Sequence, residues 1–423
     1  MSERLDVIFA SAAIGASRRL AAIPRCDNII TAAEHDPHPW VRLIAVDSLG
    51  AACADSMAAR AALTRLVDQS RGDNGAHTWQ VPARALEALA HVDPLAVNSR
   101  ITRYATAGRW EERAAAARAA TTIVNDALLY ALARDQDQNV REAAMLGLAR
   151  NRKHEADSVF LAGLAAPGYQ VVLGAANALA GTTSELALPA LLDNLDRLTQ
   201  QQSENARDPR LAMLRRIGEL GSAGTAARLR PYLSDFDTTV AATAAGFLTR
   251  WEGATVVAHA QPLPVPVEPL AQLFLSRGIR LRVTLTQASG GGSFTMLLHT
   301  DEAPATAARL IRLARAGFYN GGIWQRVEPN FVVQGGGPGA TEYIGDRTFL
   351  RDELLWHTHF RGTVGISARG RDTGDAQLYI NVVDNPLLDH EYTVAGTIIA
   401  GRDVTERILE GDAIARVEVI GAP

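Results

Sequence analysis

The feature that most constrains this chain is a short local pattern that returns several times along residues 5–251. Each copy has a turn containing Asp or Pro, a pair similar to Val-Arg, and an alanine-rich stretch that ends in Leu or Gly. The copies begin near residues 36, 79, 110, 137, 167, 208 and 235. Because apolar residues recur at helical spacing between breaks at Pro, Gly or Asp, each copy predicts a short helix. Asp or Pro would start the helix, and the small alanines would let neighbouring helices pack closely.

The spacing of the copies is roughly 28 to 40 residues, which is the length of one two-helix repeat. The pattern resembles degenerate HEAT repeats, so residues 1–252 are predicted to form an all-α HEAT-like superhelix. Repeats of this kind bury one face against each other and leave a concave surface, which predicts a protein partner on that face. An irregular helical bundle is the alternative.

Composition excludes several other classes of protein. The 423 residues are 47% hydrophobic with a net charge of −4, which indicates a globular chain of more than one unit and argues against nucleic acid as a partner. No apolar run approaches the roughly 20 residues of a membrane helix, so no membrane span is expected.

Cys26 and Cys53 suggest no disulfide framework and are interpreted as packing residues. No signal peptide is visible, which favours the cytoplasm, or a periplasmic or secreted location if a precursor segment was removed.

A change of pattern predicts a second domain. Residues 261–269 alternate proline with other residues, which favours an extended spacer, so we place a proline-rich linker at 253–272. Apolar residues then alternate along 279–285 and 294–298 around a glycine-rich turn, which predicts a β-hairpin. An amphipathic helix is expected next, ending at Gly317.

The segment that follows carries the most specific motif. Residues 324–337 have the sequence Trp-Gln-Arg-Val-Glu-Pro-Asn-Phe-Val-Val-Gln-Gly-Gly-Gly, and this resembles the signature of cyclophilin-type peptidyl-prolyl cis-trans isomerases. Residues 362–367, 376–380, 387–389 and 392–396 are similar to further family motifs in the same order. The resemblance covers about residues 278–420. It implies that 273–423 form a mostly β cyclophilin-like domain, a closed eight-stranded antiparallel barrel with flanking helices.

The chemistry of proline isomerisation needs a hydrogen-bond donor at one position. An X-Pro bond rotates over a barrier of about 18 to 20 kcal/mol because resonance makes it partly double. In the twisted state the prolyl nitrogen regains a lone pair, so a fixed guanidinium that donates to it lowers the barrier without a covalent step or cofactor. Arg326 is the candidate donor, with Gln334 to hold it and Phe331 to contact the proline ring.

An apolar pocket must hold the ring while the preceding carbonyl swings, and the resemblance adds residues that fix the residue before the proline. The remaining predicted substrate-binding residues are Val332, Ser367, Ala368, Gln377, Leu378, Tyr379, Leu387, Leu388 and Tyr392.

Several positions depart from the family pattern. Gln325 replaces a histidine, Ser367 and Ala368 replace Ala-Asn, Leu378 and Tyr379 replace a Phe pair, and Tyr392 replaces a histidine. Leu387 stands where many members have Trp. Loss of that indole donor predicts weak binding of cyclosporin-type ligands.

The predicted function is isomerisation of X-Pro bonds in proline-containing polypeptide clients, with the repeats as a scaffold that assists protein folding. The alternative is a non-catalytic scaffold whose degenerate pocket only binds proline-containing peptides. Action of the repeats as a chromophore lyase is disfavoured, because they contain no cofactor-handling motif. The pairs His35 with His38 and His357 with His359 have no third ligand at helical spacing, so they are interpreted as surface histidines and no metal site is predicted.

Overall fold

The computed structural model describes residues 26–69, 77–264 and 278–421. It divides into two compact units, residues 1–108 together with 267–423, and residues 109–266. The predicted domain boundaries at residues 252 and 273 divide the chain by its sequence pattern and not by how it packs. These boundaries stay a prediction. Each unit is described by itself.

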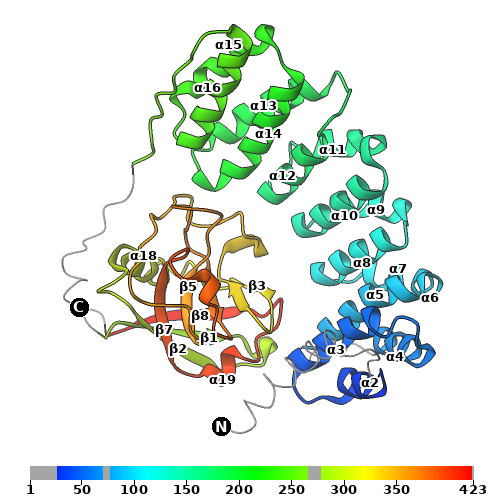
Figure 1. The fold of residues 1–423 in the computed structure, drawn as a ribbon. Coiled ribbons are helices and arrows are strands. Elements are labelled where there is room, and N and C mark those ends of the chain that lie inside the picture. Colours follow the sequence, from blue (N-terminus) through cyan, green and yellow to red (C-terminus); the bar gives the residue numbers. More distant parts are fainter. Residues whose placement is uncertain (1–25, 70–76, 265–277, 422–423) are drawn as a thin grey trace. The chain divides into compact units, whose positions relative to one another are not determined.

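The unit of residues 109–266 is helical (Figure 1). Helices α8, α10, α12, α14 and α16 pack against one another in this order, and α9, α11, α13 and α15 lie between them in the chain. The predicted helix starts near 110, 137, 167, 208 and 235 are confirmed. The α-helices of the unit are α8 (Trp110–Thr122), α9 (Asp126–Leu132), α10 (Gln138–Asn151), α11 (Asp157–Gly163), α12 (Tyr169–Ala178), α13 (Ala187–Gln200), α14 (Arg207–Leu220), α15 (Ala226–Leu229) and α16 (Thr238–Glu252).

Aspartates start two of these helices in the expected manner. The carboxylate of Asp137 accepts a hydrogen bond from the backbone N–H of Asn139 at 2.8 Å. Asp237 accepts from the N–H groups of Thr239 and Val240 at 2.9 and 3.1 Å. Each side chain therefore satisfies backbone donors that have no partner within the first turn.

The described residues of the other unit up to 108 form helices α2 (Cys26–His35), α3 (Pro39–Ala51), α4 (Met57–Asp68), α5 (Gln80–Val92), α6 (Pro94–Asn98) and α7 (Ile101–Ala105). Cys26 and Cys53 form a disulfide, with their Cα atoms 5.9 Å apart. The interpretation of both cysteines as packing residues is therefore wrong. Their positions 27 residues apart gave no recognisable pattern, and only the packing of α2 against α3 brings them together.

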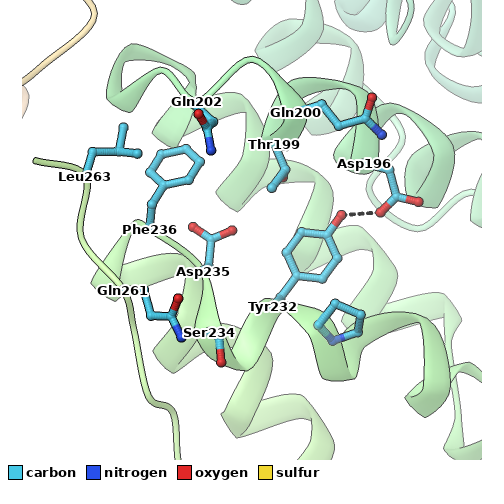
Figure 2. Close-up of a pocket in the computed structure, with 11 residues that line it drawn as sticks. Asp196, Thr199, Gln200, Gln202, Tyr232, Ser234, Asp235, Phe236, Gln261 and Leu263 are labelled. Carbon is cyan, nitrogen blue, oxygen red and sulfur yellow. Dashed lines mark hydrogen bonds between the residues drawn. The ribbon is translucent and has the colours of Figure 1, made fainter.

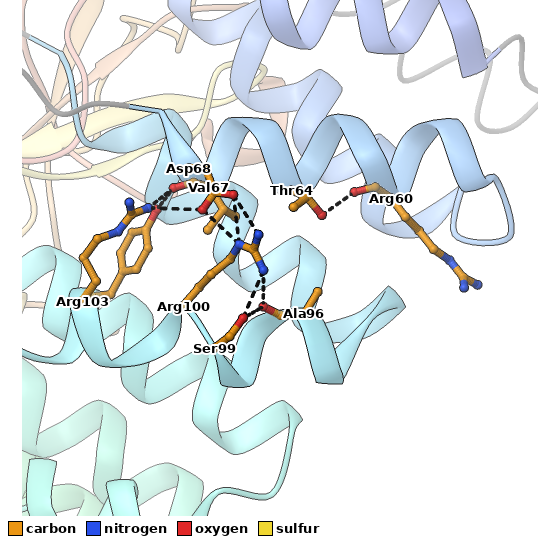
Figure 3. A network of polar contacts seen from close by, with 9 residues as sticks. Arg60, Thr64, Val67, Asp68, Ala96, Ser99, Arg100 and Arg103 are labelled. Atoms are coloured by element: carbon orange, nitrogen blue, oxygen red, sulfur yellow. Dashed lines mark hydrogen bonds and ion pairs between the residues drawn. The ribbon is translucent and has the colours of Figure 1, made fainter.

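Polar contacts join α4 to the helices that follow it (Figure 3). The Arg100 guanidinium donates to both carboxylate oxygens of Asp68, with Nη2 2.8 Å from Oδ2. Arg103 and the Tyr104 hydroxyl both donate to the carbonyl of Val67 at the end of α4. Arg103 and Tyr104 thus supply donors to a helix end whose last carbonyls lack partners in the helix.

The C-terminal part of this unit is a curled sheet of eight antiparallel strands in the order β3-β4-β6-β5-β7-β2-β1-β8 (Figure 1). The predicted hairpin is confirmed, since Leu281 of β1 pairs with Met296 of β2. Strands β3 and β8 lie at the two ends of the sheet order, and the bridge Ile323↔Ala413 brings their ends together. The strands are β1 (Arg280–Leu285), β2 (Ser293–Leu298), β3 (Trp324–Val327), β4 (Val332–Gly335), β5 (Thr363–Ile366), β6 (Leu378–Asn381), β7 (Val394–Ala400) and β8 (Ile414–Ile420).

Within residues 278–421, two α-helices accompany the sheet, α18 (Pro304–Arg315) and α19 (Arg402–Thr405). The first is the predicted amphipathic helix, and Gly317 follows it with a φ of +70°. The inner faces of the strands and of α18 bury one apolar cluster, in which Trp324 is 1% exposed.

Trp40 of α3 belongs to this same cluster and is 3% exposed. Its indole N–H donates to the carbonyl of Ile408 at 2.9 Å. Nearby, Gln80 donates to the carbonyl of Glu410 at 3.1 Å. The N-terminal helices thus contribute to the core of the β domain, which the linear order of the chain did not suggest.

The predicted linker is described up to residue 264, and its remainder lies outside the described residues. Residues 255–264 have no regular structure but hydrogen-bond to the end of the helical unit. The N–H of His259 donates to the carbonyl of Leu233 at 2.7 Å, and that of Gln261 donates to Asp235 at 2.9 Å. In the part of the chain that the structure describes, no helix has the length and apolar character needed to span a bilayer.

Candidate active site

The two polar residues of the signature lie on neighbouring strands. Arg326 of β3 is directly opposite Gln334 of β4, so both side chains project from the same face of the sheet. An Nη1 hydrogen of Arg326 points at the amide oxygen of Gln334 at 3.5 Å, a long hydrogen bond. The amide nitrogen of Gln334 donates to the Ser367 hydroxyl at 2.9 Å. Gln334 is 5% exposed, so its orientation is fixed between Arg326 and Ser367.

The Arg326 guanidinium stays accessible. Its side chain is 47% exposed and its Nε lies 3.5 Å from the Glu328 carboxylate. The guanidinium carbon lies 5.7 Å from the centre of the Phe331 ring, within the range of a cation–π contact. A guanidinium has five N–H donors, so these contacts leave donors that can reach a bound peptide.

Arg326, Gln334 and Phe331 open onto one cleft of about 90 Å³. Pockets for drug-sized ligands have volumes of roughly 300–1,000 Å³, so this cleft suits a small ring. The cleft is lined by Arg326, Phe331, Val332, Gln334, Glu342, Ser367, Ala368, Tyr379, Leu388 and Tyr392. The structure therefore brings together all three predicted catalytic residues and six of the nine other predicted site residues.

Tyr379 forms the wall of the cleft on β6, where it is paired with Gln334 of β4 and is 5% exposed. Its ring crosses Gly365 of β5, where an added Cβ would come within 2.2 Å of the ring. Only a residue without a Cβ can stand at that position while the ring stays where it is.

A buried histidine holds the Tyr379 hydroxyl. His359 Nε2 is 2.7 Å from the Tyr379 oxygen, and His359 Nδ1 is 3.1 Å from a carboxylate oxygen of Asp389. Burial lowers the pKa of His359, and the Asp389 carboxylate opposes that shift. Burial raises the pKa of Tyr379. The interpretation of His359 as a surface residue is wrong, since it is 1% exposed.

Three predicted site residues do not line the cleft. Gln377 is 1% exposed, and its amide nitrogen donates to the carbonyls of Thr341 and Ile344. Leu378 points into the apolar core of the sheet. Leu387 is 92% exposed. Neighbouring residues along a strand point to opposite faces, which separates Leu378 from Tyr379.

Sequence reasoning missed Glu342 at the rim of the cleft and the pair His359–Asp389 behind it. Glu342 belongs to a loop between β4 and β5, and no sequence signal places that loop at the cleft. Among the described residues, no group of three or more His, Cys, Asp or Glu side chains is arranged to hold a metal ion.

Comparisons with known proteins agree with the motifs. The family model for cyclophilin type peptidyl-prolyl cis-trans isomerases matches residues 282–419. A peptidyl-prolyl cis-trans isomerase of Helicobacter pylori is 37% identical over 130 residues, which are 30% of this chain and 80% of that protein. Peptidyl-prolyl cis-trans isomerase B of Bacillus subtilis is 34% identical over 133 residues, which are 31% of this chain and 93% of that protein.

A crystal structure of a Cryptosporidium parvum cyclophilin type isomerase matches 34% of this chain and 99% of its own chain, with 19% identity and a TM-score of 0.31. The sequence matches establish the class. The chain belongs to the cyclophilin-type peptidyl-prolyl cis-trans isomerase family through its C-terminal β domain. It is a peptidyl-prolyl cis-trans isomerase, with a further helical region of its own.

Proposed function

We propose that Arg326 catalyses the isomerisation by donating a hydrogen bond to the prolyl nitrogen of the twisted X-Pro bond. That nitrogen accepts a hydrogen bond only when its lone pair is released from amide resonance, so the contact is stronger in the transition state than in the ground state. The observation that carries the proposal is a half-exposed guanidinium at a small cleft, beside Gln334 and over the Phe331 ring. Gln334 orients Arg326, because its own amide is held by Ser367.

The proline ring of the substrate would occupy the apolar part of the cleft. Phe331, Val332, Leu388 and Tyr392 supply its surface, and Tyr379 closes one wall. Ser367 and Ala368 lie on the loop that leaves β5 and are placed to bind the residue that precedes the proline. Such a pocket holds the ring while leaving the preceding carbonyl free to swing.

The three predicted residues outside the cleft have separate proposed roles. Gln377 supports the cleft indirectly by holding the carbonyls of the 341–344 loop. Leu378 anchors β6 in the core. Leu387, which is almost fully exposed, would contact substrate residues beyond the proline.

We further propose that the helical region acts as a HEAT-like scaffold that binds polypeptide clients or a protein partner and so assists folding. The stacking of α8, α10, α12, α14 and α16 in sequence order supports this role, because stacked helix pairs present extended binding surfaces. Leu146 and Leu186 are 54% and 70% exposed and supply apolar contact points. A photocrosslinker at either position should capture an unfolded proline-containing client. Crosslinking from Leu387 alone would place client binding in the β domain only.

A protease-coupled assay on an Ala-Pro peptide tests the role of Arg326. Arg326→Ala should lower kcat/KM about 10²- to 10³-fold, the usual effect of removing one transition-state donor. Arg326→Lys keeps the charge without the planar fork and should also be impaired. Arg282→Ala is the matched control, because Arg282 is an exposed arginine on β1 outside the cleft. Equal rates for Arg326→Ala and Arg282→Ala would reject the proposed role.

A further inference from the structure

The helical unit holds a pocket of about 390 Å³ between α9, α10 and α11. That volume falls within the roughly 300–1,000 Å³ usual for ligand sites. Two guanidiniums line it, those of Arg134 and Arg141, together with the apolar side chains of Met145, Val159 and Ala162.

The cations of this pocket lack anionic partners among the described residues. No ion pair or side-chain hydrogen bond engages Arg134 or Arg141, and the Nε of Arg141 is buried without an acceptor. Buried N–H groups in proteins are nearly always hydrogen-bonded, since leaving one unpaired costs free energy. The Nε itself is closed to solvent, so an acceptor in the pocket would bind the terminal N–H groups of the same guanidinium.

Two carboxylates next to these arginines in the chain are committed to other contacts. Asp135 accepts two hydrogen bonds from Arg113, at 2.7 and 2.8 Å. Asp137 caps α10 through the N–H of Asn139. The positive charge at the pocket is therefore not cancelled by these neighbours.

A second pocket of the same unit shows the contrast (Figure 2). It is lined by two carboxylates, and each has a partner within the protein. Asp196 accepts from the Tyr232 hydroxyl and pairs with Arg228, while Asp235 pairs with the buried Arg210. This pocket has no comparable excess of charge.

Several residues that line the cationic pocket are apolar. Met145 is 3% exposed, and its sulfur would lie 2.8 Å from a Cβ added to Gly163. The glycine thus leaves room for the methionine side chain in the lining of the pocket. Two arginines and several apolar side chains thus line the same open pocket.

We propose that this pocket binds the C-terminal carboxylate of a polypeptide that ends in an apolar residue. A guanidinium matches a carboxylate through two parallel hydrogen bonds, and the apolar residues of the lining would contact the terminal side chain. An internal Asp or Glu offers the carboxylate without an apolar side chain on the same residue. The inference rests on the proposed role of the helical region in binding polypeptides, and it names the chemical group that is recognised.

Fluorescence anisotropy of a labelled, proline-free decapeptide ending in Leu, with the full-length protein, tests the proposal. Arg141→Ala should weaken binding about 10- to 100-fold, and amidation of the peptide terminus should do the same. Arg150→Ala removes the same charge from the same helix outside the pocket and should bind as wild type. Ser158→Glu, at an exposed rim position, should also abolish binding by placing a carboxylate there, so the test does not depend on one variant folding.

Equal binding of the peptide with a free C-terminus and of its amidated form would overturn the proposal. An amidated peptide with an internal Glu that binds as tightly as the peptide with a free C-terminus would overturn it too. Arg326→Ala should bind the carboxylate peptide as tightly as wild type while losing isomerase activity. The failure of this site is therefore distinguishable from the failure of the proposed catalytic residue. Loss of photocrosslinks at Leu146 and Leu186 with carboxylate binding retained would reject the broader scaffold role alone.

Discussion

Trp40→Ala should destabilise the β domain although Trp40 lies more than two hundred residues before it in the chain. The side chain is 3% exposed within the core cluster of the sheet, and truncating a buried Trp to Ala costs about 3–5 kcal/mol. Part of this cost is the Ile408 carbonyl, which would lose its indole donor. Trp40→Phe keeps most of the apolar contact and should cost about 1–3 kcal/mol, the usual penalty for an unpaired buried polar group.

Urea unfolding followed by both circular dichroism and isomerase activity measures this effect. With a slope of about 2 kcal/mol/M, a loss of about 4 kcal/mol lowers the midpoint by about 2 M. The midpoint for loss of activity should fall, because the helices and the sheet share one core. Trp110→Ala, in α8 of the other unit, is the control and should leave that midpoint in place. If Trp40→Ala shifts only the helical signal, the shared core is refuted.

Three further outcomes are expected. Replacing Cys26 and Cys53 by serine should cost about 3.5 kcal/mol in the chain-entropy picture for the 27-residue separation; an unchanged thermal midpoint would argue against the disulfide. Burial lowers the pKa of His299 to about 4, and the imidazole of His357 contributes to this shift. The folded state should thus keep its full stability above about pH 6.5, and this stability should fall by at most roughly 3 kcal/mol as the pH drops towards 4. In His299→Asn, the free energy of unfolding measured in urea at several pH values should depend less steeply on pH. Calorimetric titration with cyclosporin should show weak binding to wild type and tighter binding to Leu387→Trp. Tight binding to wild type would contradict the prediction that the missing indole donor at residue 387 weakens binding.

Local patterns predicted the elements of this protein well. The turn and helix pattern gave the starts of the helices, since a cap and an apolar stripe are encoded within one stretch of chain. The signature around Arg326 predicted the candidate catalytic residues, and strand pairing places Arg326 opposite Gln334. The family resemblance supplied further cleft residues, such as Tyr392, but not Glu342.

Contacts between distant segments could not be predicted in the same way. The pairing of Cys26 with Cys53 depends on how two helices pack, and the burial of Trp40 depends on a sheet that begins at residue 280. His359 was interpreted, together with His357, as one of a close pair of surface histidines. Only the fold places it behind Tyr379. Side chains alternate between the two faces of β6, so Leu378 points into the core while Tyr379 lines the cleft, although both were predicted to line it.

Exchange NMR on an Ala-Pro peptide with the full-length protein, comparing wild type with Arg326→Ala, tests the catalytic account most directly because it records binding and interconversion together. We predict that wild type accelerates cis–trans exchange, and that Arg326→Ala still binds the peptide but loses the acceleration about 10²- to 10³-fold. Exchange that is equally fast in both proteins would contradict the account.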